Sequence, residues 1–314
     1  MKRSKSLLKT TAAALAILHF INKAIDSAST AANAVKTSGK YYHWKHGDIF
    51  YKTYGEGKPL LLIHDLTVFS SSYEWTKIAN ELSDTYKVYT IDLIGCGKSD
   101  KPSLTYTSYF YVQLLSDFVK DVIGEKTHVA ATGLSGSFVM MANLLDKDLF
   151  DEIMLVSPKS ISSLKVAPDE RSKILLRLFN LPIIGKAAYY IAVNKANTEY
   201  YLTEKCFYNP FSLESTTTAS YYNAAHTSNG NGKFLLSSLD GHYLNIDISQ
   251  ALSKSENRII IVNGAHREKA CEIAKSYQHI NENILSEIVE DANYLPQLEN
   301  SGEMLEMMFL FSDK

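Results

Sequence analysis

The chain has 314 residues, of which 46% are hydrophobic and 21% are charged. This length suits one large domain with an insertion, and the composition excludes a disordered or collagen-like chain. The 32 Lys and Arg nearly balance the 34 Asp and Glu, giving a net charge of -2, so nucleic-acid binding is not expected. Cys96, Cys206 and Cys271 lie far apart without metal-ligand spacing, and we expect free thiols, no metal and no cofactor.

The N-terminal arm, residues 1–40, is predicted to lie outside the main domain. Three basic residues among the first five precede an apolar stretch from residue 12 to residue 21, and small residues follow from Ser27. This order fits a secretory signal that is cleaved. The helical spacing of Leu18, Ile21 and Ile25 also fits an amphipathic helix that lies on a membrane or docks on the protein itself. The sequence leaves open a cytoplasmic, membrane-associated or secreted location.

From residue 41 onward, short apolar runs alternate with helical patterns. The patterns predict strands at 48–54, 59–63, 87–93, 127–132, 152–156, 258–262 and 284–289, and helices at 74–82, 109–123, 138–145, 268–277 and 303–311. Strands that alternate with helices imply an α/β fold, with a mostly parallel sheet covered on both faces.

The alternation stops between residues 160 and 255, where the sequence is mostly helix-like and rich in tyrosine. We therefore predict a core at 41–159 and 256–314, interrupted by a helical cap at 160–255. Such a cap would cover the carboxyl edge of the sheet, where α/β folds bind ligands. Its tyrosine pairs, such as Tyr200-Tyr201, indicate an aromatic-lined pocket for a small apolar or aromatic ligand, with at most one tyrosine of each pair facing the pocket. The alternative is that these tyrosines form the packed core of the cap.

One sequence motif indicates nucleophilic catalysis. The predicted strand at 127–132 runs into Gly133-Leu134-Ser135-Gly136-Ser137 and then into a helix. A serine on a sharp strand-to-helix turn is a nucleophile elbow, which lifts the hydroxyl above the sheet and requires small neighbours. The motif predicts Ser135 as the nucleophile, and the alternative is an ordinary connection rich in glycine and serine.

Two further segments support this interpretation. His64-Asp65-Leu66 follows the strand at 59–63, and the loop at 92–102 has the pattern D-x-x-G-x-G-x-S. With the turn at Ser135, these motifs resemble the α/β-hydrolase superfamily, especially its branch of esterases and epoxide hydrolases with a helical cap. The resemblance covers residues 42–311, and it implies an α/β-hydrolase fold whose oxyanion donors are the N–H groups of Leu66 and Gly136.

The resemblance also marks a departure at Asp65, which stands where the family has glycine. A carboxylate at this position opposes a developing oxyanion unless it points away or is paired. The family's acid, three residues past a glycine, falls on Arg267, and the neighbouring Glu268 is the candidate for an orienting acid. The alternative is that Glu268 only stabilises the N-terminus of the helix that follows.

The family's histidine is replaced by Tyr294 in the segment 291–300. A serine needs a base with a pKa near neutrality, whereas tyrosine stays protonated there. Tyr294 is therefore predicted to be a hydrogen-bond donor and a poor base. His266 is the best substitute base, and His226 and His242 in the cap are further candidates.

Three hypotheses follow from the sequence. The first is a serine hydrolase of small apolar carboxylic esters, with activity weakened by Tyr294. The second is a catalytically inactive pseudo-hydrolase that acts as a ligand-binding or interaction protein. The third is a scaffold tethered to a membrane by its N-terminal helix.

Overall fold

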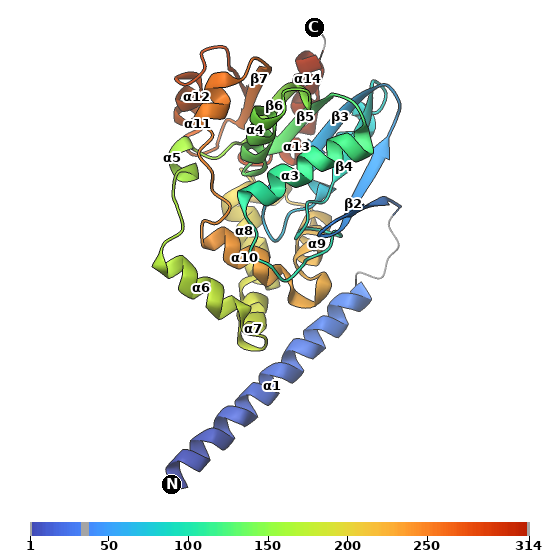
Figure 1. Cartoon of the computed structure of the whole chain (residues 1–314). Helices are drawn as coiled ribbons and strands as arrows, with labels where there is room; N and C mark the ends of the chain where they lie inside the picture. Colours follow the sequence, from blue (N-terminus) through green and yellow to red (C-terminus); the bar gives the residue numbers. More distant parts are fainter. Residues whose placement is uncertain (1, 33–37, 313–314) are drawn as a thin grey trace.

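The computed structural model describes residues 2–32 and 38–312. Eight strands form one sheet in the order β1-β2-β4-β3-β5-β6-β7-β8 (Figure 1). Strand β2 pairs with β1 and with β4 in antiparallel orientation, and all the other neighbouring strands are parallel. The strands are β1 Lys40–Trp44, β2 Gly47–Tyr54, β3 Lys58–Ile63, β4 Tyr86–Ile91, β5 Thr127–Thr132, β6 Phe150–Val156, β7 Arg258–Gly264 and β8 Leu285–Val289.

The helices connect these strands and extend the chain at both ends. They are α1 Lys2–Ala32, α2 Ala79–Leu82, α3 Ser108–Phe118, α4 Ser135–Leu145, α5 Ile161–Leu164, α6 Glu170–Asn180, α7 Ile184–Ala192, α8 Lys195–Tyr201, α9 Ser215–Ala225, α10 Gly232–Asp240, α11 Ser249–Lys254, α12 Ala270–Gln278, α13 Pro296–Glu299 and α14 Ser301–Ser312. The strand predictions are confirmed to within a few residues, because continuous apolar runs mark strands that are buried on both faces.

Both faces of the sheet are covered, which explains those apolar runs. In β3, Leu61 and Ile63 face a core that includes residues of α3, α4 and α12, whereas Leu60 and Leu62 face a second core beneath α2 and α14. Successive side chains of a strand point to opposite faces, so every position of a central strand must be apolar. The predicted α/β-hydrolase fold is confirmed.

The segment between β6 and β7 holds α5 to α11 and forms the helical cap. Helices α6, α7 and α10 pack against one another, while α11 packs on α4 of the core. Figure 1 shows α6 and α7 at the end of the molecule that is far from the C-terminus. The cap therefore encloses one edge of the sheet and presents α6 and α7 on its outer side.

Helix α1 docks on the cap through its C-terminal half and projects beyond the body (Figure 1). Asn22 donates from Nδ2 to the carbonyl oxygen of Ile183 at 3.1 Å, and Lys186 forms an ion pair with Asp26 at 2.5 Å. No single helix within the described residues is long and apolar enough to cross a bilayer. Helices α6 and α7 pass that test of length and composition only together, as a pair bent by 103°.

Candidate active site

The sharp turn between β5 and α4 is centred on Gly133. Its φ of 59° lies in the left-handed region, and Ser135 is already the first residue of α4. The left-handed residue between strand and helix is the one that a nucleophile elbow holds above the sheet. Ser135 is therefore two residues beyond the elbow position, and the prediction that places it there is corrected. Ala131 and Ser135 are the small residues that flank the turn.

Ser135 is completely buried. Its Oγ donates to the carbonyl oxygen of His64 at 2.6 Å. The imidazole of His64 bonds through Nδ1 to the carbonyl oxygen of Asp65 at 2.6 Å and accepts from Leu93 N–H through Nε2 at 2.9 Å. Burial lowers the pKa of His64, so the ring is a neutral structural group. Ser135 has a hydrogen-bond acceptor but no base in this arrangement.

The carboxylate of Asp65 points towards the elbow and fills the space above it. The N–H groups of Leu66 and Leu134 both donate to Asp65 Oδ1, each at 2.8 Å. Leu134 follows the elbow residue and Leu66 lies in the loop after β3, which are the two sources of an oxyanion hole in this fold. The carboxylate oxygen of Asp65 thus takes the place of a substrate oxyanion.

The prediction that the Gly136 N–H is the second oxyanion donor is also wrong. Gly136 lies inside α4 and is buried, and a Cβ placed on it would approach Leu155. Leu134, one residue after Gly133, takes the role predicted for Gly136 because the elbow itself is two residues earlier. The Leu66 amide lies at the predicted position, but it is already bonded to Asp65.

Tyr294 binds the other oxygen of the same carboxylate. Its hydroxyl donates to Asp65 Oδ2 at 2.9 Å, and its own N–H donates to the carbonyl oxygen of Cys206 in the cap at 3.0 Å. Burial, and then the charge of Asp65, raise the pKa of Tyr294 well above its usual value. Tyr294 stays protonated, as the sequence predicts, and acts as a donor to Asp65.

Gly133 is required by its neighbours as well as by its backbone. A Cβ at residue 133 would collide with the Asp65 carboxylate and with the Tyr294 hydroxyl. The positive φ adds strain for any residue that carries a Cβ. Asp65, Gly133 and Tyr294 therefore form a mutually dependent set, which we call the plug.

In the loop after β7, the position of the family's acidic residue is occupied by the positively charged Arg267. The guanidinium of Arg267 lies 5.5 Å from the centre of the Tyr294 ring and donates to the carbonyl oxygen of Pro158 at 2.5 Å and to the side chain of Asn263. Glu268 points to solvent, with 90% of its side chain exposed, and lies 4.0 Å from Lys269. The role predicted for Glu268 as an orienting acid is therefore not supported by its position.

The histidines proposed as substitute bases lie elsewhere. His266 is exposed and stacks on Tyr208 with ring centres 3.3 Å apart. His226 stacks on Tyr190 and Tyr222 within the cap, and His242 is exposed. Among the hydrogen bonds of the described residues, none joins a histidine side chain to the side chain of Ser135, Asp65 or Tyr294.

A buried glutamate beneath the plug was not identified from the sequence. Glu74 accepts from the N–H of Asp65 at 2.9 Å and is fully buried. Burial, and then the charge of Asp65, raise the pKa of Glu74 to about 8. Only the unusual Asp65 could have signalled this second carboxyl, because nothing in the local helical pattern distinguishes Glu74 from a solvent-exposed residue.

Aromatic residues of the cap form a packed cluster over the plug, which is the core packing that stands as the alternative to an aromatic-lined pocket. Tyr201 stacks on Phe69 with ring centres 5.2 Å apart, and Tyr221 is buried with its hydroxyl 3.4 Å from Glu74 Oε1. Both belong to an apolar cluster that also contacts Tyr294. One open side remains, a surface hollow of ≈ 780 Å³ beside Tyr294 that is lined by Lys159, Arg267 and the residues around them.

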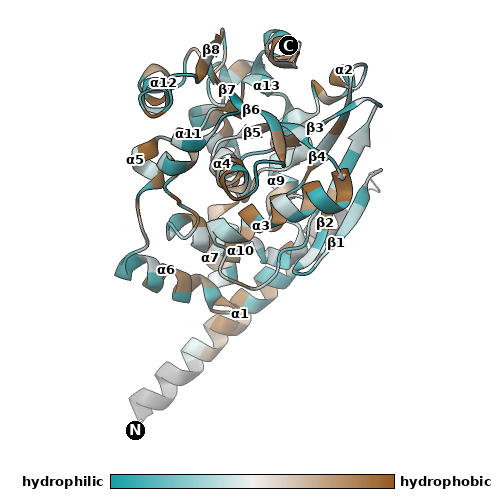
Figure 2. Ribbon diagram, turned by 45° about the horizontal axis from the view of Figure 1, so that its top comes forward, coloured by the Kyte–Doolittle hydropathy of each residue, from teal (hydrophilic) through white to brown (hydrophobic). Residues whose placement is uncertain are grey.

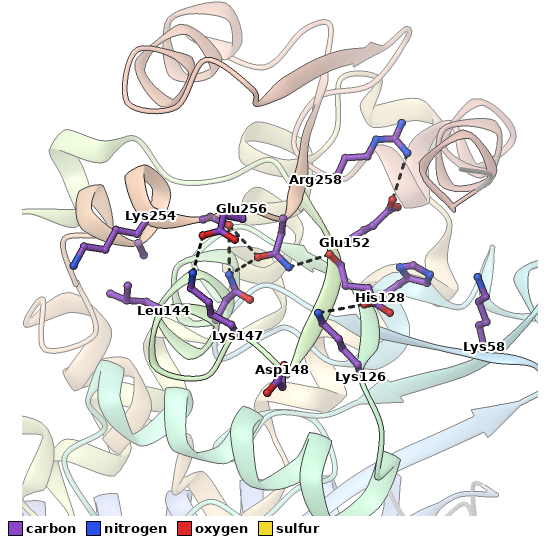
Figure 3. A pocket seen from close by; sticks show the side chains of 15 residues that line it. Lys58, Lys126, His128, Leu144, Lys147, Asp148, Glu152, Lys254, Glu256 and Arg258 are labelled. Carbon is purple, nitrogen blue, oxygen red and sulfur yellow. Dashed lines mark hydrogen bonds and ion pairs between the residues drawn. The ribbon is translucent and has the colours of Figure 1, made fainter.

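A second hollow, of ≈ 530 Å³, lies at the opposite edge of the sheet (Figure 3). The amino ends of β5, β6 and β7 contribute to it, whereas Gly133 lies at the carboxyl end of β5. Several of its charges are paired with one another, with Lys147 2.9 Å from Glu256 and Arg258 3.6 Å from Glu152. Because α/β folds bind ligands at the carboxyl edge, the plug marks the position of the active site.

The fold and the elbow together define an α/β hydrolase. The profile described as the alpha/beta hydrolase family matches residues 60–266, and the chain belongs to this family. It is similar to 2-hydroxy-6-oxo-6-(2'-aminophenyl)hexa-2,4-dienoic acid hydrolase of Metapseudomonas resinovorans, with 27% identity over 104 residues, 32% of this chain and 36% of that protein. It is also 27% identical over 133 residues to an uncharacterized protein of Mycobacterium tuberculosis, 42% of this chain and 36% of that protein. The matched segments span about a third of these relatives.

Solved structures share the fold at low identity. A serine hydrolase involved in carbazole degradation has a TM-score of 0.72 at 16% identity, covering 87% of this chain and 98% of that one. A membrane phospholipase A has a TM-score of 0.69 at 19% identity, covering 100% of this chain and 98% of that one. These likenesses show that the chain shares its fold with these structures.

Proposed function

We propose that this protein is a catalytically inactive α/β hydrolase that acts as a binding or interaction protein. The observation that supports this most directly is Asp65 Oδ1, which accepts from the N–H groups of Leu66 and Leu134 at 2.8 Å each. An oxyanion hole stabilises charge only when its donors are free to meet the transition state. Here the two amides already bind an internal carboxylate.

Three further positions support the same proposal. The elbow residue is Gly133, which has no nucleophilic atom, and Tyr294 holds a phenolic proton where a base is needed. Arg267 stands at the position of the acid. A serine hydrolase acting through Ser135 would need its buried hydroxyl to leave the carbonyl of His64 and gain a base.

The ligand class remains the one predicted from the cap. Tyr201, Tyr221 and Phe207 belong to the cluster that packs beside Tyr294, and aromatic side chains suit a small apolar or aromatic molecule. In this proposal such a molecule is bound without being cleaved, because no group at the elbow attacks it.

Fluorophosphonate labelling of the full chain tests the proposal. We expect no labelling of the wild-type protein, because a fluorophosphonate reacts with an activated serine. Stoichiometric labelling that disappears in Ser135→Ala would overturn the proposal and restore the serine-hydrolase hypothesis.

A reversion series sharpens this test. The variant Asp65→Gly/Gly133→Ser/Arg267→Asp/Tyr294→His rebuilds a serine, histidine and aspartate around an open oxyanion hole. Its matched control keeps Gly133 and carries the other three changes. We expect labelling and hydrolysis of p-nitrophenyl acetate only in the variant with Ser at 133. Equal signals in two folded proteins would contradict the assignment of residue 133 as the elbow.

A further inference from the structure

We infer that the outer side of α1, α6 and α7 binds the surface of an anionic lipid bilayer. This inference concerns a part of the molecule remote from the plug and does not depend on the proposed function. The face consists of large apolar side chains that are between 42% and 71% exposed. We call it the apolar face, and its members are Ile17, Phe20, Ile21, Ile174, Leu178, Leu181, Ile184 and Ile191.

The face arises from the helical spacing of its residues. In α6, Ile174 and Leu178 are four residues apart and Phe179 faces the protein interior, and Leu181 lies immediately after the end of the helix. In α7, Ile184 and Ile191 are separated by seven residues, which is two helical turns. Each helix therefore has one apolar stripe that packs inward and a second one that meets water.

Helix α1 also has apolar side chains exposed to solvent, and polar contacts fix its inner side to the cap. Asn22 is buried against Ile183, and Asp26 pairs with Lys186 and accepts from the hydroxyl of Tyr190. The exposed Ile17, Phe20 and Ile21 precede this anchor in the sequence by one or two turns. Figure 2 shows a hydrophobic stretch of α1 between its N-terminal part and the body of the molecule. The helix is fixed to α7 by polar groups, while apolar groups face outward.

Such an exposed apolar surface is costly in water and marks an interaction site. Its end of the molecule also carries an excess of basic side chains. Residues 10–28 and 169–192 together carry five Lys and Arg against three Asp and Glu, which leaves 27 against 31 for the rest of the chain. Lys186 pairs with Asp26 and Lys173 with Glu170, while Arg171 and Arg177 are exposed on α6 beside the apolar face.

This combination favours a lipid surface over a second copy of the chain. Arg171, Lys173 and Arg177 are exposed on α6 between and beside the apolar stripe of Ile174 and Leu178. Basic side chains that flank an apolar helical stripe bind anionic headgroups while the stripe enters the acyl boundary. Two copies meeting through this face would bring their positive charges together, which is unfavourable.

Vesicle flotation of the full chain tests this inference. We expect the protein to float with vesicles of phosphatidylcholine and phosphatidylglycerol and much less with phosphatidylcholine alone. The variant Ile174→Asp/Ile191→Asp should bind about tenfold more weakly, because charged groups replace two exposed apolar side chains that would enter the bilayer. The control Leu145→Asp/Leu310→Asp changes residues of matched exposure (66% and 65%, against 65% and 69%) outside the face and should bind like wild type.

Two further measurements separate a lipid surface from other partners. Raising the salt from about 0.1 M to about 1 M should weaken binding to the anionic vesicles, since the Debye length falls from about 10 Å to about 3 Å. Equal binding by the face variant and the control variant, both with wild-type circular dichroism, would overturn the inference. So would a wild-type dimer in light scattering that the face variant dissociates while vesicle binding is absent.

Discussion

The plug and the apolar face differ in how their chemical groups are partnered. At the plug, each oxygen of Asp65 accepts a hydrogen bond, and the amides of an oxyanion hole are engaged by the protein itself. On the apolar face, eight large side chains meet solvent beside a cluster of basic residues. In the plug, the hydrogen-bond donors that would contact a substrate already have acceptors within the protein. The apolar face exposes surface whose burial against a partner would be favourable.

The comparison indicates how a hydrolase fold can change its role. A reactive cleft keeps polar groups free in a dry site, at a cost in stability. Here Asp65 accepts hydrogen bonds from Leu66, Leu134 and Tyr294, so donors that a catalytic cleft leaves free are satisfied within the protein. The side chains of the apolar face, by contrast, are exposed to solvent.

The largest effect is expected when the plug is broken at its crowded centre. Gly133→Ser places a side chain against Asp65 and Tyr294 and strains a left-handed backbone, so we expect a loss of about 3–4 kcal/mol in the free energy of unfolding. Urea denaturation measures this. The control Gly124→Ser also has a positive φ, but a Cβ there meets nothing within 4 Å, so it should lose much less.

The same substitution should be milder once its neighbours are reduced. In an Asp65→Gly/Tyr294→His background, Gly133→Ser should cost less than in wild type, because the collision with the carboxylate is gone. A cost that is the same in both backgrounds would show that the three residues are not mutually dependent.

A second prediction concerns the pH dependence of stability beneath the plug. The pKa of Glu74 is raised to about 8 in the folded protein, from 4.5. The folded state therefore binds the Glu74 proton more tightly than the unfolded state does. The contribution of protonated Glu74 to the free energy of unfolding is complete below pH 4.5, falls as the pH rises and is lost above about pH 8. We expect Glu74→Gln to remove a decline on the order of 4 kcal/mol between pH 5 and pH 8, measured by denaturation at each pH.

Glu256→Gln is the control for this pH series, because Glu256 is an exposed carboxyl with a pKa below its usual value. It should leave the decline in place. If the stability of Glu74→Gln fell with pH in parallel with that of wild type, Glu74 would not be the group whose ionisation causes the decline.

The smallest effect is expected at Ser135. Ser135→Ala removes one hydrogen bond to the carbonyl oxygen of His64 and should cost about 1 kcal/mol without changing labelling or ligand binding. Ser137→Ala, which removes a bond to the carbonyl oxygen of Leu134 at 2.7 Å, is the matched control. A loss of activity confined to Ser135→Ala would return catalysis to that residue.

The register of the elbow shows where reasoning from the sequence reached its limit. Two patterns of small residues overlap, one centred on Ser135 and one centred on Gly133. Both are compatible with a strand followed by a helix, and only the backbone angle decides between them. The choice of Ser135 followed from its chemistry, since serine is the reactive residue.

The replacement of histidine by Tyr294 can be identified from the sequence, because residues 291–300 align without a gap with the family's pattern around its histidine. Its role as a hydrogen-bond donor also follows from the chemistry of phenol. Its acceptor could not be identified, because Asp65 is 229 residues away in the chain and reaches Tyr294 only through the fold.

The sequence by itself determined the α/β alternation, the position of the cap and the family, because apolar periodicity and turn motifs are local properties. Tertiary structure alone decided that the Asp65 carboxylate enters the oxyanion hole and that Glu74 lies buried beneath it. Those outcomes depend on the approach of segments far apart in the chain, where distances of a few tenths of an ångström separate a hydrogen bond from a collision.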